Sequence, residues 1–278
     1  MRLFILGIIL TIISWIFSWT RFYTPINEVI FFPLWLGYIL TINGFSEVIF
    51  HTSLLRKMRY SFLILFLISI PMWWYFEFLN QFLQNWHYIS TRPVSPLEYF
   101  IRASVDFSTV VPAVLSTTFL FKRVIEIVNK CEFKKRDIRK SVLFGIIFFG
   151  IVTLIAMPFF PTILFPFAWM SAYFIIDPVN NLLGKRSLFK DYLNGNWINI
   201  FSLSLATLFT GFWWEMWNFY SLPKWYYTIP YVGFYKIFEM PILGYLGYIP
   251  FSFEIFSFTV LAFGLINLFY KKVSLPEL

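Results

Sequence analysis

Two stretches of the sequence place a carboxylate and an amide about one helical turn apart in an apolar, aromatic run. PMWWYFEFLNQFLQNWHY contains Glu77 and Asn80, and FWWEMWNFYSLPKWYY contains Glu215 and Asn218. An ionisable side chain in hydrocarbon is costly and normally marks a functional site. A carboxylic acid in an apolar pocket can stay protonated at neutral pH and act as a general acid. We expect each asparagine to hydrogen-bond and orient its acid.

Aromatic side chains surround both acids. The residues expected to contact a substrate are Trp73, Trp74, Asn80, Trp86, Tyr88, Trp213, Trp214, Asn218, Trp225 and Tyr227. The faces of Trp and Tyr attract cations by roughly 0.5–2 kcal/mol per contact, so they can stabilise a carbocation. An acid inside such a cage suits protonation of an alkene and cyclisation of a long apolar polyene. The alternative is an aromatic belt at the membrane interface, where Trp and Tyr are common in any membrane protein.

Further charged residues follow both stretches. Glu98, Arg102 and Asp106 are spaced i, i+4, i+8 and would share one helical face. They form either a mutually neutralising ladder or a polar pocket that meets Glu77. In the second half, Glu239 precedes PILGYLGYIP, whose glycines and prolines favour a broken segment that lines a cavity. The candidate acids and bases are Glu77, Glu98, Glu215 and Glu239.

Sites for metals, nucleotides and diphosphates lack their usual sequence motifs. No P-loop or aspartate-rich motif appears, and no glycine-rich fingerprint follows a strand. His51 and His87 are expected on opposite sides of the membrane, and Cys131 is the single cysteine, so we expect no metal and no cofactor. The net charge of +8 comes from basic residues between apolar segments. It indicates membrane topology rather than nucleic-acid binding.

Composition predicts that these residues lie in a membrane. Hydrophobic residues make up 59% of the chain and charged residues 13%, whereas soluble domains contain about 25% charged residues. Apolar runs of about 20 residues, enough to cross the hydrocarbon core, recur along the chain. The eight expected spans are residues 3–20, 28–50, 60–83, 97–121, 141–160, 162–184, 196–219 and 248–270. We therefore predict an all-α, polytopic transmembrane helical bundle.

Basic residues predict the orientation of this bundle. Most Lys and Arg residues fall on the side that would hold both termini and the cluster from Lys122 to Lys140. By the positive-inside rule, both termini are expected in the cytoplasm, with the chain integral to the cell (inner) membrane. Both acid-bearing stretches then lie near the outer ends of their spans. Membrane lipids are expected partners, and nucleic acid is not.

The sequence also indicates an internal repeat. FFPLWLGYILTING is echoed by FPFAWMSAYFIIDP, which aligns Asn43 with Asp177. The expected parts are a first four-span repeat at 1–121, a basic cytoplasmic connector at 122–140 and a second four-span repeat at 141–278. Four spans are an even number of crossings, so the repeats would be parallel and related by an axis along the membrane normal.

Motifs in both halves resemble the lycopene cyclase domain of small membrane-bound archaeal, fungal and heterodimeric bacterial carotenoid cyclases. Glu77 stands nine residues before Trp86 of W-x-Y, and PLEYF resembles the family's P-x-E-E-x-F-F. Glu215 stands ten residues before Trp225. The chain reads WYFE where the family has Asp directly after Trp, and PLEYF has one acid where the family has two. The resemblance implies a duplicated membrane isomerase of carotenoid biosynthesis that cyclises end groups without redox change or metal.

Three functions fit these patterns. The first is an intramembrane isomerase that cyclises a carotenoid or related isoprenoid. The second is a non-catalytic carrier or transporter of an apolar lipid or isoprenoid molecule at the repeat interface. The third is a membrane scaffold whose polar groups hold helices together. Replacing the buried acids by glutamine distinguishes the first from the other two, because glutamine keeps the shape and removes the transferable proton.

Overall fold

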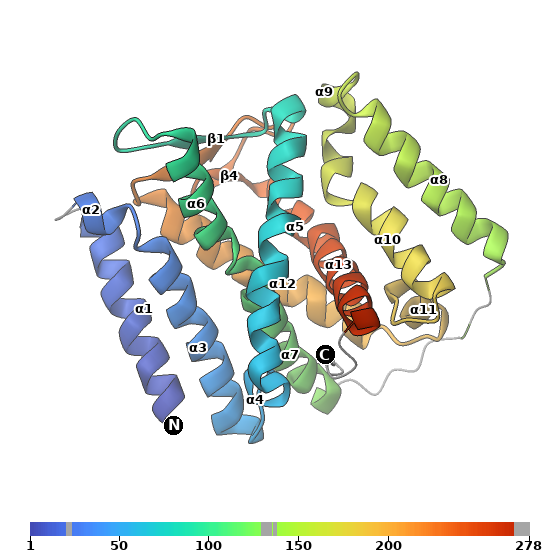
Figure 1. Cartoon of the computed structure of the whole chain (residues 1–278), viewed down its shortest axis with the longest axis horizontal. Coiled ribbons are helices and arrows are strands. Elements are labelled where there is room, and N and C mark those ends of the chain that lie inside the picture. Colours follow the sequence, from blue (N-terminus) through green and yellow to red (C-terminus); the bar gives the residue numbers. More distant parts are fainter. Residues whose placement is uncertain (21–23, 129–134, 136–137, 270–278) are drawn as a thin grey trace.

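The computed structural model describes the chain except for residues 21–23, 129–134, 136–137 and 270–278. Helices make up most of the described chain, which confirms the all-α class (Figure 1). The helices of the first half are α1 (Arg2–Thr20), α2 (Thr24–Asn27), α3 (Phe31–Phe50), α4 (Leu54–Met58), α5 (Phe62–Leu83), α6 (Pro96–Phe107) and α7 (Val110–Val128). Those of the second half are α8 (Lys140–Ala156), α9 (Pro161–Leu164), α10 (Ser171–Leu182), α11 (Leu188–Leu193), α12 (Ile198–Phe219) and α13 (Tyr248–Phe269).

Several helical runs are suited to a membrane. Within the described residues, five are long and apolar enough to cross one: Arg2–Thr20, Phe31–Phe50, Leu54–Leu83, Pro161–Leu182 and Ile242–Leu268. A further apolar helix, Lys140–Ala156, is shorter. The chain therefore has the character of a membrane protein, and the count of eight spans stays a prediction.

Short 3₁₀ segments join or extend these helices. They are η1 (Arg59–Ser61), η2 (Phe165–Trp169) and η3 (Ile242–Gly247). The sequence PILGYLGYIP, expected as a broken segment, forms η3 and leads directly into α13. The expected connector begins as a continuation of α7, which extends to Val128, and residues 129–134 and 136–137 of it lie outside the described residues.

Helices α1 and α3 pack at very short range because glycines lie in their interface. A Cβ atom on Gly7 would lie 2.4 Å from the backbone nitrogen of Thr41, and one on Gly37 would lie 2.6 Å from that of Thr11. Small residues allow this close approach, which supplies van der Waals contact between helices in lipid. The two threonine hydroxyls donate to carbonyls four residues earlier in their own helices, so both hydroxyls are hydrogen-bonded.

Short helix α4 is anchored by a buried asparagine of α3. Asn43 Oδ1 accepts a hydrogen bond of 2.9 Å from the N–H of Leu55, and its Nδ2 donates to Ser116 of α7 at 2.8 Å. Ser53 caps α4 by accepting from the N–H of Arg56 at 3.1 Å. Capping oxygens satisfy N–H groups that have no partner inside the helix.

Short helix α11 is anchored in a comparable way by Asp177 of α10. Its carboxylate accepts from the N–H of Leu188 at 2.9 Å and from the hydroxyl of Ser257 of α13 at 2.8 Å. Ser187 caps α11 by accepting from the N–H of Lys190 at 3.2 Å. The sequence comparison aligned this aspartate with Asn43, and the two residues occupy matching hydrogen-bonded positions.

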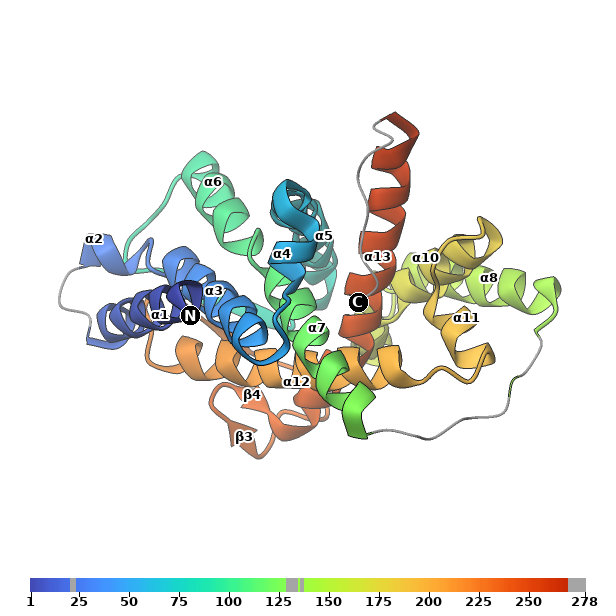
Figure 2. The same ribbon diagram turned by 90° about the horizontal axis from the view of Figure 1, so that it is seen from below.

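The centre of the molecule is formed by helices from both halves. Figure 2 shows α7 and α12 crossing near the middle. The hydroxyl of Tyr38 on α3 lies 2.8 Å from that of Thr117 on α7 and 3.3 Å from that of Thr210 on α12. One continuous core cluster contains buried side chains such as Trp35, from the first half, and Phe256, from the second. The two halves therefore share a core.

A two-stranded antiparallel ribbon also joins the halves. β1 (Trp86–Ile89) pairs with β2 (Lys224–Tyr227), with Trp86 opposite Tyr227 and Tyr88 opposite Trp225. A second, shorter pair is formed by β3 (Lys236–Ile237) and β4 (Met240–Pro241). The spans expected from the sequence end at residues 83 and 219, so both W-x-Y segments were expected outside the regular helices. Strands form here because each segment supplies backbone hydrogen-bonding groups to the other. The two segments lie in different halves of the chain, so no local sequence pattern predicts their pairing.

Candidate functional site

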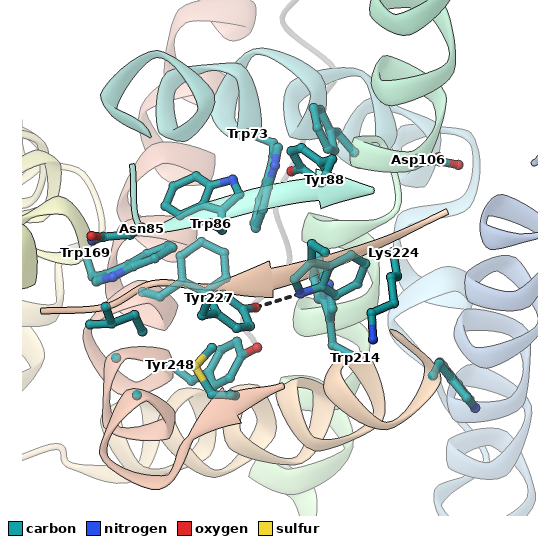
Figure 3. Close-up of a pocket in the computed structure, with 18 of the residues that line it drawn as sticks. Trp73, Asn85, Trp86, Tyr88, Asp106, Trp169, Trp214, Lys224, Tyr227 and Tyr248 are labelled. Atoms are coloured by element: carbon teal, nitrogen blue, oxygen red, sulfur yellow. Dashed lines mark hydrogen bonds between the residues drawn. The ribbon is translucent and has the colours of Figure 1, made fainter. Parts of the chain in front are cut away.

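A cavity of about 500 Å³ lies beside the β1–β2 ribbon (Figure 3). Both halves of the chain contribute to its walls. Its aromatic lining residues are Phe31, Trp73, Trp86, Tyr88, Phe107, Phe165, Trp169, Trp214, Trp217, Trp225, Tyr227, Tyr248 and Phe251. Trp73 of α5 and Trp214 of α12 stack with ring centroids 5.2 Å apart and planes at 24°. This composition suits an apolar, unsaturated ligand.

Glu77 lies behind this aromatic lining. Its Oε1 accepts hydrogen bonds from Nε1 of Trp73 at 3.0 Å, from Nε1 of Trp86 at 3.1 Å, and from the hydroxyl of Tyr88 at 2.6 Å. All three donors line the cavity, whereas the glutamate is 5% exposed and does not. The carboxylate is therefore connected to the cavity through its donors.

Asn80 holds the start of the ribbon rather than the acid. Its Nδ2 donates to the carbonyl of Trp86 at 2.8 Å, and its Oδ1 accepts from the N–H groups of Asn85 and Trp86 at 2.8 and 3.3 Å. We expected this amide to hydrogen-bond Glu77. Instead it fixes the backbone of β1, which in turn carries two of the donors to that glutamate.

Glu215 is also buried behind cavity-lining residues. Its Oε1 accepts from the hydroxyls of Tyr227 at 2.7 Å and Tyr248 at 2.6 Å. Nε1 of Trp225 donates to the Tyr227 hydroxyl at 2.8 Å, so the tryptophan acts on the acid through the tyrosine (Figure 3). Oε2 is buried and has no hydrogen-bond partner among the described residues.

Asn218 repeats the role of Asn80. Its Nδ2 donates to the carbonyl of Trp225 at 2.7 Å, and its Oδ1 accepts from the N–H of Trp225 at 2.8 Å. In both stretches, therefore, the E-x-x-N spacing serves two different tasks. The glutamate faces the aromatic donors, and the asparagine fixes the strand that carries them.

Glu98 belongs to a four-residue ionic cluster. Its Oε1 lies 2.5 Å from Arg92 and 2.7 Å from Arg102, and both arginines also pair with Glu28, at 3.2 and 2.6 Å. The hydrogen bond from the Thr91 hydroxyl and the contacts with the arginines lower the pKa of Glu28 from 4.5 to about 2. Part of the expected ladder exists, but its principal partners, Glu28 and Arg92, were not anticipated from the helical spacing.

Glu239 forms an ion pair with Lys224. The ammonium also donates to the carbonyl of Phe219 at 3.2 Å. Lys224 lines the cavity, whereas Glu239 and Glu98 do not. Of the four candidate acids, Glu98 and Glu239 are thus engaged by cations, and Glu77 and Glu215 are engaged by neutral donors.

Two of the predicted aromatic residues lie outside the cavity lining. Trp74 stacks on Phe100 with centroids 5.0 Å apart and donates to Ser104 at 2.9 Å. Trp213 packs against Trp217, with centroids 5.4 Å apart. The other predicted aromatic residues line the cavity: Trp73, Trp86, Tyr88, Trp214, Trp225 and Tyr227.

Two residues of the cavity wall, Tyr248 and Trp169, were not proposed as site residues from the sequence, and a third residue, Glu254, has a structural role. Tyr248 donates to Glu215 from the start of α13, and Trp169 of η2 lines the cavity and stacks on Phe76 at 5.0 Å. Glu254 of α13 accepts from the N–H of Ala172 at 2.9 Å and so caps α10, directly after η2. None of the three forms a local motif with the acids. The echo of FFPLW in FPFAW marks the tryptophan of η2 but not its function.

No protein-family model, curated protein or solved structure matches the chain in comparisons with known proteins. Within the described residues, no group of three or more His, Cys, Asp or Glu side chains is placed to hold a metal ion.

Proposed function

We propose that this protein binds an elongated, apolar, isoprenoid-like molecule in the aromatic cavity and isomerises it by acid catalysis, as the resemblance to the lycopene cyclase domain implies. The observation that carries the proposal is that two buried glutamates each accept a hydrogen bond from a tyrosine of the cavity wall. Those tyrosines are Tyr88, for Glu77, and Tyr227 and Tyr248, for Glu215. Proton transfer between each acid and a bound alkene then passes through a hydroxyl group.

The hydrogen bonds around the two acids favour different protonation states. Three donors on one oxygen of Glu77 suit an ionised carboxylate, because hydrogen bonds to a charged acceptor are strong. The unpartnered, buried Oε2 of Glu215 suits a carboxylic acid, because burying an ionised oxygen without a partner is costly. We therefore assign proton donation to Glu215 and its tyrosines.

The reaction balances without an oxidant or reductant. For this step the proton of Glu215 lies on Oε1, which donates it to the oxygen of one tyrosine, while the hydroxyl proton of that tyrosine passes to one alkene carbon and leaves a carbocation on the neighbouring carbon. A second double bond attacks that carbocation and closes a ring. Ring closure moves the positive charge to a carbon of that second double bond. A carbon next to it then loses a proton, which returns through the same tyrosine hydroxyl to the Glu215 carboxylate. Trp73 and Trp214, stacked at the cavity wall, would stabilise the cationic intermediate by roughly 0.5–2 kcal/mol per good contact.

We further propose that the chain crosses the cell membrane eight times, as two parallel repeats with cytoplasmic termini. Matched pairs of residues support the repeat: Asn43 with Asp177, Ser53 with Ser187, Glu77 with Glu215, Asn80 with Asn218, and Tyr88 with Tyr227. The basic helix α4 and the basic segment around α11 lie towards one side of the molecule, opposite α2, α9 and the ribbon (Figure 1). The positive-inside rule places that basic side in the cytoplasm.

The test is pigment analysis in a bacterial host that accumulates lycopene. We expect the wild-type chain to convert lycopene into cyclised products. Glu215→Gln should lower the conversion at least about a hundredfold, the contribution of a general acid, while its expression and thermal stability stay near those of the wild type. Glu126→Gln, at an exposed helix position away from the cavity, is the matched control and should retain full conversion.

Two outcomes would contradict the catalytic proposal. The first is the absence of any cyclised product from the wild-type chain. The second is a Glu215→Gln variant that retains turnover. If Glu215→Leu lowers stability while Glu215→Gln changes nothing, the acids only hold helices together, and the protein is a carrier or scaffold.

A further inference from the structure

The two ends of the cavity differ in polarity. All charged residues in its lining, Glu28, Asp106 and Lys224, come from the elements around α2, α6 and the start of β2. Figure 3 shows Asp106 and Lys224 to one side of the cavity and Trp169 to the other, with Tyr227 and Tyr248 between them. The lining near Trp169 is completed by the apolar residues and glycines of η3. A ligand of uniform polarity would match only one end.

The cations at the polar end are already neutralised. Glu28 pairs with Arg92 and Arg102, and Lys224 pairs with Glu239. A diphosphate or carboxylate group would therefore have to displace an existing carboxylate to gain a cationic partner. Burying an anion without such a partner is costly.

Asp106 is the acidic lining residue that has no direct hydrogen-bonded or ion-paired partner among the described residues. No ion pair and no hydrogen bond to its carboxylate is formed by any residue in the described part of the chain. Lys224 has three N–H donors, of which two are engaged by Glu239 and by the carbonyl of Phe219. The polar end thus offers an open acceptor and an open donor.

We infer, on the basis of the proposed function, that among isoprenoid chains the cavity prefers a neutral amphiphile, a chain that ends in a hydroxyl group, over the matching hydrocarbon and over an anionic diphosphate. A hydroxyl group both donates and accepts. It can donate to the Asp106 carboxylate or accept from the Lys224 ammonium without changing the net charge of the cavity. The chain then extends past the tyrosines towards Trp169 and η3, so the bond that receives the proton lies away from the hydroxyl end.

Binding of three matched probes to the full-length protein in lipid nanodiscs tests this inference. The probes are geranylgeraniol, geranylgeranyl diphosphate and the corresponding hydrocarbon without the oxygen, and tryptophan fluorescence of the aromatic cavity reports their binding. We expect the alcohol to bind about tenfold more tightly than the hydrocarbon, since one added hydrogen bond in a buried site contributes roughly that much. The diphosphate should bind most weakly.

Substitution of Asp106 locates the hydroxyl end. Asp106→Leu should lower the affinity for the alcohol about tenfold, to that for the hydrocarbon, and leave hydrocarbon binding unchanged, which also shows that the variant is folded. Asp106→Asn, which keeps an acceptor oxygen, should retain part of the preference. Glu126→Leu, at an exposed position outside the cavity, is the control and should retain the full preference.

The outcomes separate this inference from the proposed function. Equal binding of alcohol and hydrocarbon, or tightest binding of the diphosphate, would overturn the inference alone. An alcohol preference that survives Asp106→Leu would also overturn it. Failure of every probe to bind would overturn both.

Discussion

The regions around Glu77 and Glu215 share a sequence motif but assemble their hydrogen-bonded carboxylates differently. In each, a tyrosine of the ribbon donates to the acid and an asparagine one turn later clamps the ribbon. In the first region the other donors are Trp73 and Trp86, both supplied by the same stretch of chain. In the second region the other donor is Tyr248, which comes from α13.

One position explains this difference. The residue four before the acid is Trp73 in the first region and Gly211 in the second. A Cβ atom on Gly211 would lie 2.7 Å from the ring of Tyr248. The rings that pack against Trp73 are those of Phe76, Phe107, Trp214 and Phe251, which carry no hydroxyl group. The glycine therefore makes room for a tyrosine donor where the first region uses a tryptophan from its own helix.

The motif specifies the ribbon and one tyrosine donor, while the remaining donors are set by packing. Glu77 accepts three hydrogen bonds from nearby residues, and Glu215 accepts two and keeps one oxygen without a partner among the described residues. The second site is thus the less saturated of the two. This is why the proposed proton donor is Glu215.

The largest effect is expected from Gly211→Ala. The added methyl group collides with the Tyr248 ring, so this tyrosine must move away from Glu215. We expect a loss of about 1–3 kcal/mol in the free energy of unfolding, typical of overpacking, measured by SDS titration of the purified protein. The control is Gly145→Ala, where a Cβ would meet nothing within 4 Å. It should leave stability unchanged or raise it by up to about 1 kcal/mol. Equal effects at both glycines would contradict the packing explanation.

The second prediction tests whether Asn80 and Asn218 support the ribbon equally. Asn80→Ala and Asn218→Ala each remove hydrogen bonds to the ribbon backbone and leave buried groups unsatisfied. Each should cost about 1–3 kcal/mol. The two losses, measured by the same titration, should agree within about 1 kcal/mol. A large loss at one asparagine and none at the other would show that the matched hydrogen bonds are not equivalent supports.

The sequence predicts the positions of the two buried acids but not the hydrogen-bond partners of the neighbouring amides. The spacing of Glu77 to Asn80, and of Glu215 to Asn218, is local, so it was visible as a pattern and led to both buried acids. The use of each amide was not visible, because its partner is the backbone of a strand that exists only when both halves pair. The ion pairs of Glu98 with Arg92 were hidden for a related reason, since loop conformation brings them together.

Removal of a single tyrosine hydroxyl should affect the two regions differently. Tyr248→Phe leaves Glu215 with a single donor, Tyr227, whereas Tyr88→Phe leaves Glu77 with two tryptophan donors. We expect Tyr248→Phe to cost about 1–2 kcal/mol and Tyr88→Phe about 0.5–1 kcal/mol. In the pigment assay Tyr248→Phe should also lower conversion more than Tyr88→Phe. A larger effect at Tyr88 on both measurements would reverse the assignment of the proton donor.

The smallest effect concerns the ionic groups outside the two acid sites, where the halves also differ. Glu28 sits in a cluster with Glu98 and two arginines, whereas Glu239 in the second half pairs with Lys224. The pKa of Glu28 falls from 4.5 to about 2 in the folded protein, because Thr91 and the arginines stabilise its ionised form. A group with a lowered folded-state pKa contributes stability above its unfolded pKa and loses it as the pH falls.

The wild-type protein should therefore lose part of its stability between pH 4.5 and pH 2, measured by thermal unfolding in detergent across that range. Glu28→Gln should be less stable at neutral pH and show a shallower loss in the same window. Parallel pH profiles for the two proteins would show that the cluster contributes nothing to folding.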